Sequence, residues 1–413
     1  MAKEYKDLVV GLDIGTSKVM VVVAEVMPGG ELKLAGMGVA PGNGLKRGVV
    51  VNIDATVQSI QQALKEAELM ADCKITRVNT GITGSHIRGL NSSGMVAVKD
   101  KEVTPADVAR VVETARAINI STDQRLLLVA PQEFVIDGQD VKEPIGMSGM
   151  RLEAKVHIVT GAQSAAENII KCVRRCGLEV DQLLLNPLSS SLAVLTEDER
   201  ELGAACIDMG GGSTGLSIFM KKHMIFSDSV RLGGDHVTSD IAQCLHVPFA
   251  VAERIKTKHG GVHATGMDDR EMIEIGGDSG DWEKDRRQVS RTELIGIIRP
   301  RVEEILEQAA ERLEAAGFSH LPSQQIVLTG GASQIPGLDG LASRILGQRV
   351  RMGRPLRVQG LPQAATGPSF ASTVGLCLFA AHPQDEWWDF DIPAERYPAR
   401  SIKRALKWFK DNW

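Results

Sequence analysis

The sequence lacks any run of about 18 consecutive apolar residues, the length that a helix needs to cross a bilayer. Its beginning, MAKEYKDLVV, lacks the apolar core of a secretory signal peptide. An excess of positive charge is also missing, because the formal net charge is -5. That balance argues against a general nucleic-acid binder. We therefore expect a protein that is made and kept in the cytosol and that does not bind nucleic acid.

Cysteines at zinc-binding spacing are absent as well. The six cysteines are scattered through apolar segments, and Cys172 and Cys176 could share a helix face. No histidine or second cysteine pair stands near them at the spacing of a zinc site. We predict buried, reduced thiols. With 413 residues, 43% hydrophobic and 24% charged, the chain has the composition of a soluble globular protein with two or more domains.

The sequence does contain one pattern that occurs twice. The segments LVVGLDIGTSKVMVVVAEV from Leu8 and AACIDMGGGSTGLSIF from Ala204 each have a β-like run that ends in an aspartate, a glycine-rich turn and a second β-like run. Glycine lets a backbone approach an anion, so the N–H groups of the turn can point at phosphate oxygens. Asp13 and Asp208 could hold Mg²⁺ through its waters. The pattern predicts two phosphate clamps that face each other across a nucleoside triphosphate.

The residues after each turn separate this pattern from other phosphate binders. A dinucleotide fingerprint or a Walker loop opens a helix after its glycines, whereas KVMVVVAEV from Lys18 has no helical period and predicts a hairpin. A third glycine turn, IVLTGGASQIPGL from Ile326, follows another strand-like run and precedes a helix predicted over Leu338 to Leu346. A nucleoside would lie against Gly330 and Gly331.

The remaining segments alternate between strand-like and helical patterns, which predicts sheets covered by helices. Helices are expected from Asp54 as N-cap to Met70, after Thr104 as N-cap, through PLSSSLAVLTEDER from Pro187, and through RVEEILEQAAERLEAAG from Arg301. The predicted division is lobe 1 (1–84, 164–199 and 365–381), a first insertion (85–163), lobe 2 (200–233 and 301–364), a second insertion made mostly of solvated loops (234–300), a linker (382–400) and a terminal helix (401–413).

The last 13 positions, SIKRALKWFKDNW, predict a short amphipathic helix. Its apolar stripe comprises Ile402, Leu406, Phe409 and Trp413. Its basic face comprises Lys403, Arg404, Lys407 and Lys410. Such a helix lies in a membrane interface, and each basic residue near anionic lipid contributes about 1 kcal/mol. We expect reversible binding to anionic membrane; packing on the body of the protein or on a partner helix is the alternative.

The assembled motifs DIGTSK, DMGGGST, AERIK and LTGGASQIPG resemble the actin, sugar-kinase and heat-shock-chaperone superfamily. Over nearly the whole chain, including PQEFVIDGQDVKEPIGMSGMRLEAKVHIVTG and the tail, the sequence is similar to the FtsA family of bacterial cell-division proteins. The resemblance implies an α/β fold with two actin-like (ribonuclease-H-like) lobes around a nucleotide cleft, each with an inserted subdomain. It further implies tethering of FtsZ filaments to the inner membrane, self-association into protofilaments and recruitment of later division proteins.

The resemblance also assigns site residues, with ATP and Mg²⁺ as cofactors. The phosphate loops would be Asp13, Gly15, Thr16, Ser17 and Lys18, and Asp208, Gly210, Gly211, Gly212, Ser213 and Thr214; the nucleoside would meet Glu253, Lys256, Gly330, Gly331 and Ala332. One position departs from the chaperone pattern, because Asn186 precedes Pro187 where relatives place a glutamate. An amide cannot act as a base, so we expect slow hydrolysis at most and ATP mainly as a conformational ligand.

The terminal peptide of FtsZ is acidic, so the basic candidates for its docking are Arg286, Arg287, Arg291 and Arg301. Simple solvation of these arginines is the alternative. Two other functions remain open on the same fold: a small-molecule kinase or polyphosphate-type phosphatase, and a pilus-assembly relative. Neither has a use for a tethered basic amphipathic tail, so the tail favours the membrane adaptor.

Overall fold

The computed structural model describes residues 7–266, 268–275 and 287–381. The predicted linker (382–400) and terminal helix (401–413) therefore lie outside the described residues. The described chain forms two large sheets, a smaller four-stranded sheet and two short two-stranded ribbons.

The first large sheet has the strand order β11-β6-β1-β2-β3-β19. β1 pairs antiparallel with β2 and parallel with β6. The apolar run from Val19 to Ala24 in β2 is buried at every position, as expected of a strand that is covered on both faces. Its strands are β1 (Leu8–Ile14), β2 (Lys18–Val26), β3 (Leu32–Pro41), β6 (Arg77–Ile82), β11 (Glu179–Leu185) and β19 (Val358–Gln359).

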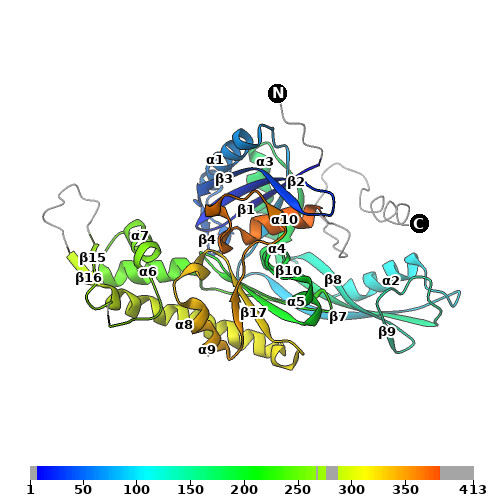
Figure 1. Cartoon of the computed structure of the whole chain (residues 1–413). Coiled ribbons are helices and arrows are strands. Elements are labelled where there is room, and N and C mark those ends of the chain that lie inside the picture. The colour runs from blue at the N-terminus through cyan, green and yellow to red at the C-terminus, as the bar shows by residue number, and fades with distance from the viewer. Residues whose placement is uncertain (1–6, 267, 276–286, 382–413) are drawn as a thin grey trace.

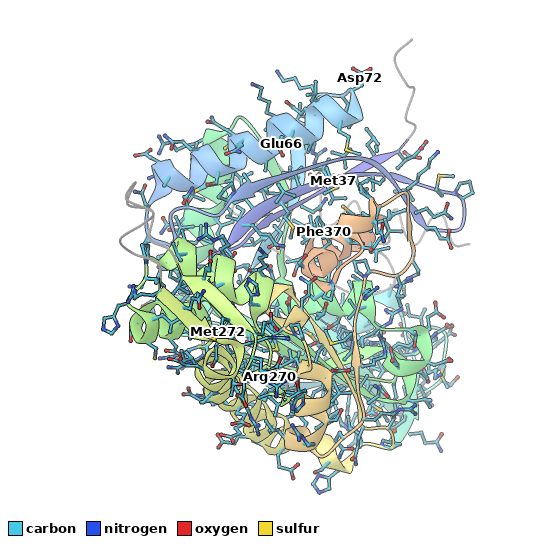
Figure 2. The ribbon with its side chains drawn as sticks, turned by 60° about the vertical axis from the view of Figure 1, so that its left-hand side comes forward. Met37, Glu66, Asp72, Arg270, Met272 and Phe370 are labelled. Atoms are coloured by element: carbon cyan, nitrogen blue, oxygen red, sulfur yellow. The ribbon has the colours of Figure 1, made fainter. Side chains whose placement is uncertain are left out.

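Helices cover both faces of this sheet. In Figure 2, the helix that carries Glu66 lies on one side of the strand of Met37, and the helix that begins beside Phe370 lies on the other. The second of these helices packs closely on α4, because a Cβ at Gly375 would lie 1.7 Å from the Ser189 carbonyl oxygen. The covering helices are α1 (Ile53–Ala71), α3 (Gln163–Arg175), α4 (Asn186–Val194) and α10 (Ala371–Ala381).

The second large sheet, β14-β13-β12-β17-β18, repeats the plan of the first. β12 pairs antiparallel with β13 and parallel with β17, as β1 does with β2 and β6. The prediction that both halves follow one plan is confirmed for the sheets. Its elements are β12 (Ala204–Met209), β13 (Thr214–Met220), β14 (His223–Val230), β17 (Gln325–Thr329) and β18 (Val350–Met352), with α6 (Gly234–Leu245), α7 (Phe249–His259), α8 (Arg291–Ala315) and α9 (Leu338–Leu346).

The smaller sheet, β7-β10-β8-β9, is antiparallel throughout. One helix, α2, packs on it, and Thr104 is its N-cap as predicted, with a capping box that Asp107 completes. The elements are β7 (Arg88–Ala97), α2 (Pro105–Arg116), β8 (Gln124–Ile136), β9 (Gln139–Val141) and β10 (Arg151–Ala162). The two-stranded ribbons are β4 (Leu45–Lys46) with β5 (Val49–Val50) and β15 (Met272–Ile275) with β16 (Arg287–Ser290).

Figure 1 shows how these parts are arranged. The smaller sheet and α2 extend to one side of the molecule, and α6, α7 and the β15–β16 hairpin extend to the other. The largest hydrophobic core centres on the first large sheet and also includes Val159 of the smaller sheet and Val327 of the second large sheet. A second core belongs to the second large sheet and its helices, and two small clusters belong to the smaller sheet and α2. None of the helices in the described ranges combines the length and the apolar character needed to cross a membrane.

Three predicted details are wrong. The N-cap of α1 is Asn52, whose side chain accepts a hydrogen bond from the Ala55 N–H at 3.1 Å, so Asp54 lies within the first turn. The helix predicted from Pro187 to Arg200 is two helices, because Thr196 caps a second one, α5 (Glu197–Leu202). Cys244 is exposed rather than buried, and Cys73 and Cys176 are half-buried.

The helix predicted to begin at Arg301 begins at Arg291. Ser290 caps it by accepting a hydrogen bond from the Glu293 N–H at 3.2 Å, and Pro300 lies inside it. Proline normally ends or kinks a helix, but here α8 continues through the proline because Leu294, Ile298, Val302 and Ile305 bury one continuous face in the second core. The segment predicted as loops before residue 300 therefore includes the first part of a long helix.

Candidate functional site

The first glycine turn joins β1 to β2 as a hairpin. The Gly15 N–H donates to the Lys18 carbonyl oxygen at 3.0 Å, and a Cβ at Gly15 would lie 2.7 Å from that same oxygen. Only glycine fits so tight a closure. Asp13 stands at the end of β1, opposite Met20 in the antiparallel register.

The second glycine turn has the same construction. It joins β12 to β13, and the Gly210 N–H donates to the Ser213 carbonyl oxygen at 3.0 Å. Asp208 occupies the position in β12 that Asp13 occupies in β1. Neither turn opens a helix, so the hairpin prediction is confirmed for both.

The two turns meet. A Cβ at Gly212 would lie 2.6 Å from the Thr16 hydroxyl oxygen, and a Cβ at Gly211 would lie 3.0 Å from the Ser17 Cβ. Segments almost 200 positions apart in the chain are thus in direct contact through their glycines. The structure brings both predicted phosphate loops to one place.

The first turn of α4 links the two aspartates. The Asn186 amide donates to Asp13 Oδ1 at 3.0 Å, and the Ser190 hydroxyl donates to Asp208 Oδ2. Positions i and i+4 of a helix lie on the same face, so one helical face serves both carboxylates. Ser372 on α10 also donates to Asp208 Oδ2, at 3.1 Å.

Burial shifts the pKa values of both aspartates, and the charge of Asp208 adds to the shift of Asp13. Asp13 and Asp208 are 8% and 9% exposed. Burial, followed by the nearby charge of Asp208, raises the pKa of Asp13 to about 6, although the Asn186 hydrogen bond opposes this shift. Burial likewise raises the pKa of Asp208, against the hydrogen bonds from Ser190 and Ser372. Two buried carboxylates that repel each other favour a cation between them.

The third glycine turn lies against the second. Gly330 has a φ of 86°, and a Cβ there would lie 2.4 Å from Asp208 Oδ1. The turn leads through a 3₁₀ segment into α9, with the bounds that the sequence predicts. A Cβ at Gly234 would lie 3.0 Å from the Ala332 Cβ and 3.5 Å from the Lys256 Nζ, so α6, α7 and this turn converge.

Lys256 is held by its neighbours. Its ammonium donates to the Gly234 carbonyl at 3.1 Å and to the Thr238 hydroxyl at 2.8 Å, and it pairs with Glu253 at 2.6 Å. The predicted nucleoside residues Glu253, Lys256 and Ala332 are therefore gathered on one side of the turns. The sequence analysis missed Asp235, whose carboxylate would lie 2.9 Å from a Cβ at Gly211, and whose pKa burial raises.

The Lys18 ammonium lies 5.5 Å from the centre of the Phe370 ring, which stands at the start of α10 (Figure 2). Burial lowers the pKa of Lys18, and the charge of Asp13 opposes the shift. The amine is thus a partly desolvated cation close enough to Asp13 to be influenced by its charge. Sequence reasoning also missed Phe370, Ser190 and Ser372; the polar run SSS after Pro187 was a signal for Ser190 alone.

The residues present fit a magnesium nucleotide. Mg²⁺ in nucleotide sites takes one or two carboxylates together with waters and phosphate oxygens, and Asp13 and Asp208 supply that pair. In the described part of the chain, His, Cys, Asp and Glu nowhere form a group of three that could hold a metal alone. Within the described ranges the buried Asn186 Oδ1 has no hydrogen-bond partner, and it packs closely against Gly81.

The predicted docking arginines lie apart from these turns. Arg301 on α8 binds Asp240 through two nitrogens, at 2.7 and 3.1 Å, and also contacts Glu304. Arg291 pairs with Asp268 at 2.9 Å. Arg287 is exposed on β16 and donates to the His246 carbonyl at 3.3 Å. Arg286 and the predicted membrane residues 402–413 lie outside the described residues.

Replacing Asp13 with asparagine should stabilise the nucleotide-free protein above pH 6. The raised pKa means that the stability from Asp13 is complete below about pH 4 and is lost as the pH rises through about 6. A displacement from 3.8 to about 6 corresponds to at most ~3 kcal/mol. Urea unfolding at pH 4 and pH 8 measures the difference, with Asp269→Asn at an exposed position as control. A larger effect of Asp13→Asn at pH 4 than at pH 8 would contradict the reasoning.

Comparison with known proteins identifies the family to which the chain belongs. The model "Cell division protein FtsA" matches residues 205–375, and the model "SHS2 domain inserted in FTSA" matches residues 84–160. The cell division protein FtsA of Pseudomonas aeruginosa is 43% identical over 412 residues, which cover 98% of each chain. That of Neisseria meningitidis serogroup B is 46% identical over 367 residues, 88% of each chain.

Two solved structures share the fold. The PilM–PilN type IV pilus biogenesis complex has a TM-score of 0.65 at 20% identity and covers 90% of this chain and 98% of that chain. MreB5 of Spiroplasma citri bound to ADP has a TM-score of 0.55 at 13% identity and covers 92% and 99%. The predicted α/β fold, with actin-like lobes and an inserted subdomain, is confirmed. With relatives this similar over nearly its whole length, the chain belongs to the FtsA family of cell division proteins.

Proposed function

We propose that this chain is an ATP-binding adaptor of cell division that links FtsZ filaments to the cytoplasmic face of the inner membrane at the septum. The observation that carries the ATP-binding part is the meeting of two hairpin turns, each with an aspartate at its strand end. Family membership supports the role in division. The same proposal includes self-association into actin-like filaments and recruitment of later division proteins.

ATP with Mg²⁺ would bind where the three glycine turns converge. Asp13 and Asp208 would hold the ion through water, the N–H groups of the first two turns would receive the phosphates, and Glu253 and Lys256 would contact the nucleoside. The neighbouring MreB5 structure is bound to ADP, which supports a nucleotide on this fold. The bound ion would neutralise developing phosphate charge.

Nucleotide would also set the angle between the lobes. The first two turns touch in the present structure, so we expect the lobes to part when phosphates enter between them. Such hinge motion around a ligand converts binding energy into a change of shape. A conformational role fits the chemistry of the site, because Asn186 cannot accept a proton and its amide already donates to Asp13. We expect turnover far below that of efficient ATPases, measured as steady-state phosphate release.

Replacing Lys256 with alanine should lower ATP affinity about 10- to 100-fold, since a hydrogen bond to a charged group contributes about 1.5–3 kcal/mol. Titration of a fluorescent ATP analogue in Mg²⁺ measures the effect. Lys258→Ala, two positions further along α7 and exposed, is the matched control. Equal affinities of the two variants would remove Lys256 from the site.

The membrane contact would be made by the predicted basic amphipathic helix at 401–413. Its apolar stripe would enter the interface while four basic residues meet anionic lipid. Deletion of residues 401–413 should move the protein from the pellet to the supernatant when it is sedimented with anionic vesicles.

A second variant, with those four basic residues replaced by glutamine, should bind neutral vesicles as weakly as the wild type does and should lose the preference for anionic ones. Co-sedimentation of the truncated protein with anionic vesicles would contradict the proposal that residues 401–413 bind the membrane.

For the acidic FtsZ peptide, the contacts within the protein favour Arg287 over the other described candidates. Arg301 and Arg291 are each paired with carboxylates of their own chain. Within the described ranges no carboxylate pairs with Arg287. An unpaired exposed arginine offers its full charge to a partner, whereas a paired one must first leave its partner.

Arg287→Glu should therefore weaken peptide binding about fivefold, in line with the modest energy of exposed ion pairs, and leave the melting temperature unchanged. Arg301→Glu should instead lower the melting temperature, because it places a third acid beside Asp240 and Glu304. Fluorescence anisotropy of a labelled peptide and thermal unfolding measure the two effects. Unchanged affinity in Arg287→Glu would move the docking surface elsewhere.

The predicted division into lobes and insertions forms part of the proposal. The strands of the smaller sheet, 88–162, fall within the first insertion as predicted at 85–163. For the second insertion we propose an end near Ser290, because α8 continues without a break across residues 300 and 301.

A further inference from the structure

The β4–β5 ribbon reaches both phosphate turns. Arg47 and Gly48 form the turn at its tip. The Gly48 N–H donates to the Thr16 hydroxyl of the first phosphate turn at 3.0 Å. A Cβ at Gly212 of the second phosphate turn would lie 2.7 Å from the Arg47 Cα. The tip of the ribbon is therefore in contact with both turns, at the place where the two lobes meet (Figure 1).

Arg47 has a backbone conformation that arginine disfavours. Its φ is 52°, and that of Gly48 is 80°, as in a type I′ turn. Asparagine, aspartate and glycine are favoured at the first position of such a turn, because the Cβ of other residues crowds the backbone in the left-handed region. Turn geometry therefore does not explain an arginine here, and strain of this kind is typical of functional sites.

The Arg47 side chain is not engaged by the rest of the described protein. It is exposed, and within the described ranges no hydrogen bond or ion pair involves its guanidinium. Burial, followed by the charge of Arg47, lowers the pKa of His236 in the first turn of α6. That turn is bonded to the second phosphate turn, because the Gly234 N–H donates to the Gly210 carbonyl at 2.9 Å. An unpaired cation thus lies close to the second phosphate turn.

The other charges at the site do not suffice for an anionic ligand. The three glycine turns and their neighbours bring together four carboxylates and two ammonium groups, namely Asp13, Asp208, Asp235 and Glu253, and Lys18 and Lys256. A divalent cation would only balance this set, so the negative charges of a triphosphate require further donors. The planar fork of a guanidinium matches phosphate oxygens well.

We propose that Arg47 binds the phosphates of the nucleotide, as a donor that the β4–β5 ribbon adds to the two glycine turns. This inference rests on the proposed ATP-binding function. The guanidinium donates to phosphate oxygens between the turns, and the bound phosphates hold the tip of the ribbon in return. Because the tip contacts both turns, Arg47 also connects the occupancy of the site to the contact between the lobes.

Titration of the full chain with a fluorescent ATP analogue in Mg²⁺ tests the proposal. Arg47→Asn removes the charge and places a residue that tolerates the left-handed backbone. ATP affinity should fall at least fivefold, whereas the melting temperature of the nucleotide-free protein should stay equal or rise. The loss of affinity should become smaller in concentrated sodium chloride, because salt screens the attraction between the guanidinium and the phosphates.

Two further variants complete the test. Arg47→Lys keeps the charge without the planar fork and should restore part of the affinity. Lys46→Ala removes the neighbouring exposed cation of the same ribbon and should bind ATP as the wild type does. Unchanged affinity in Arg47→Asn, an equal loss in Lys46→Ala, or a melting temperature that falls together with the affinity would overturn the role of Arg47. A wild type that binds no ATP would overturn the proposed nucleotide site itself, so the two failures are distinguishable.

Discussion

The arrangement of the site depends on two buried carboxylates held next to each other by one short helix. Asp13 and Asp208 end equivalent strands of two sheets, and the first turn of α4 donates to both, through Asn186 and Ser190. Every residue of α4 is buried, so this helix cannot move away without exposing apolar surface. Burial, followed by the charge of Asp208, raises the pKa of Asp13 and leaves the pair in need of a cation. The need for a counter-charge and the shape of the turns thus both fit a magnesium nucleotide.

Coupling between the lobes follows from the same packing. The glycine turns touch through positions where any Cβ would clash, and α10 brings Ser372 to the aspartate of the second sheet while it packs on the first. A ligand between the turns would therefore change the contact between the two large sheets. Family membership shows a cell division protein, and this geometry gives a physical means by which a nucleotide would regulate it.

Local signals predicted the elements that local chemistry controls. The N-cap at Thr104, the hairpins after Asp13 and Asp208, and the helix after the third glycine turn could all be predicted, because turn residues and periodicity act over a few positions. Errors arose where distant packing decided the outcome. α8 extends through Pro300 because its apolar face is buried in the second core, and this burial overrides the break that a proline favours locally. Arg291, expected in a loop, consequently begins a helix and pairs with Asp268.

By itself the sequence determined that an aspartate stands near the end of the first strand of each hairpin and that glycines close both turns. Residue identity sets the backbone conformations that a turn can adopt, so these features needed no fold. Only the tertiary structure decided which side chains complete the site. Ser190, Ser372, Asp235 and Phe370 come from separate elements, and their roles depend on distances across the sheets that no spacing along the chain encodes.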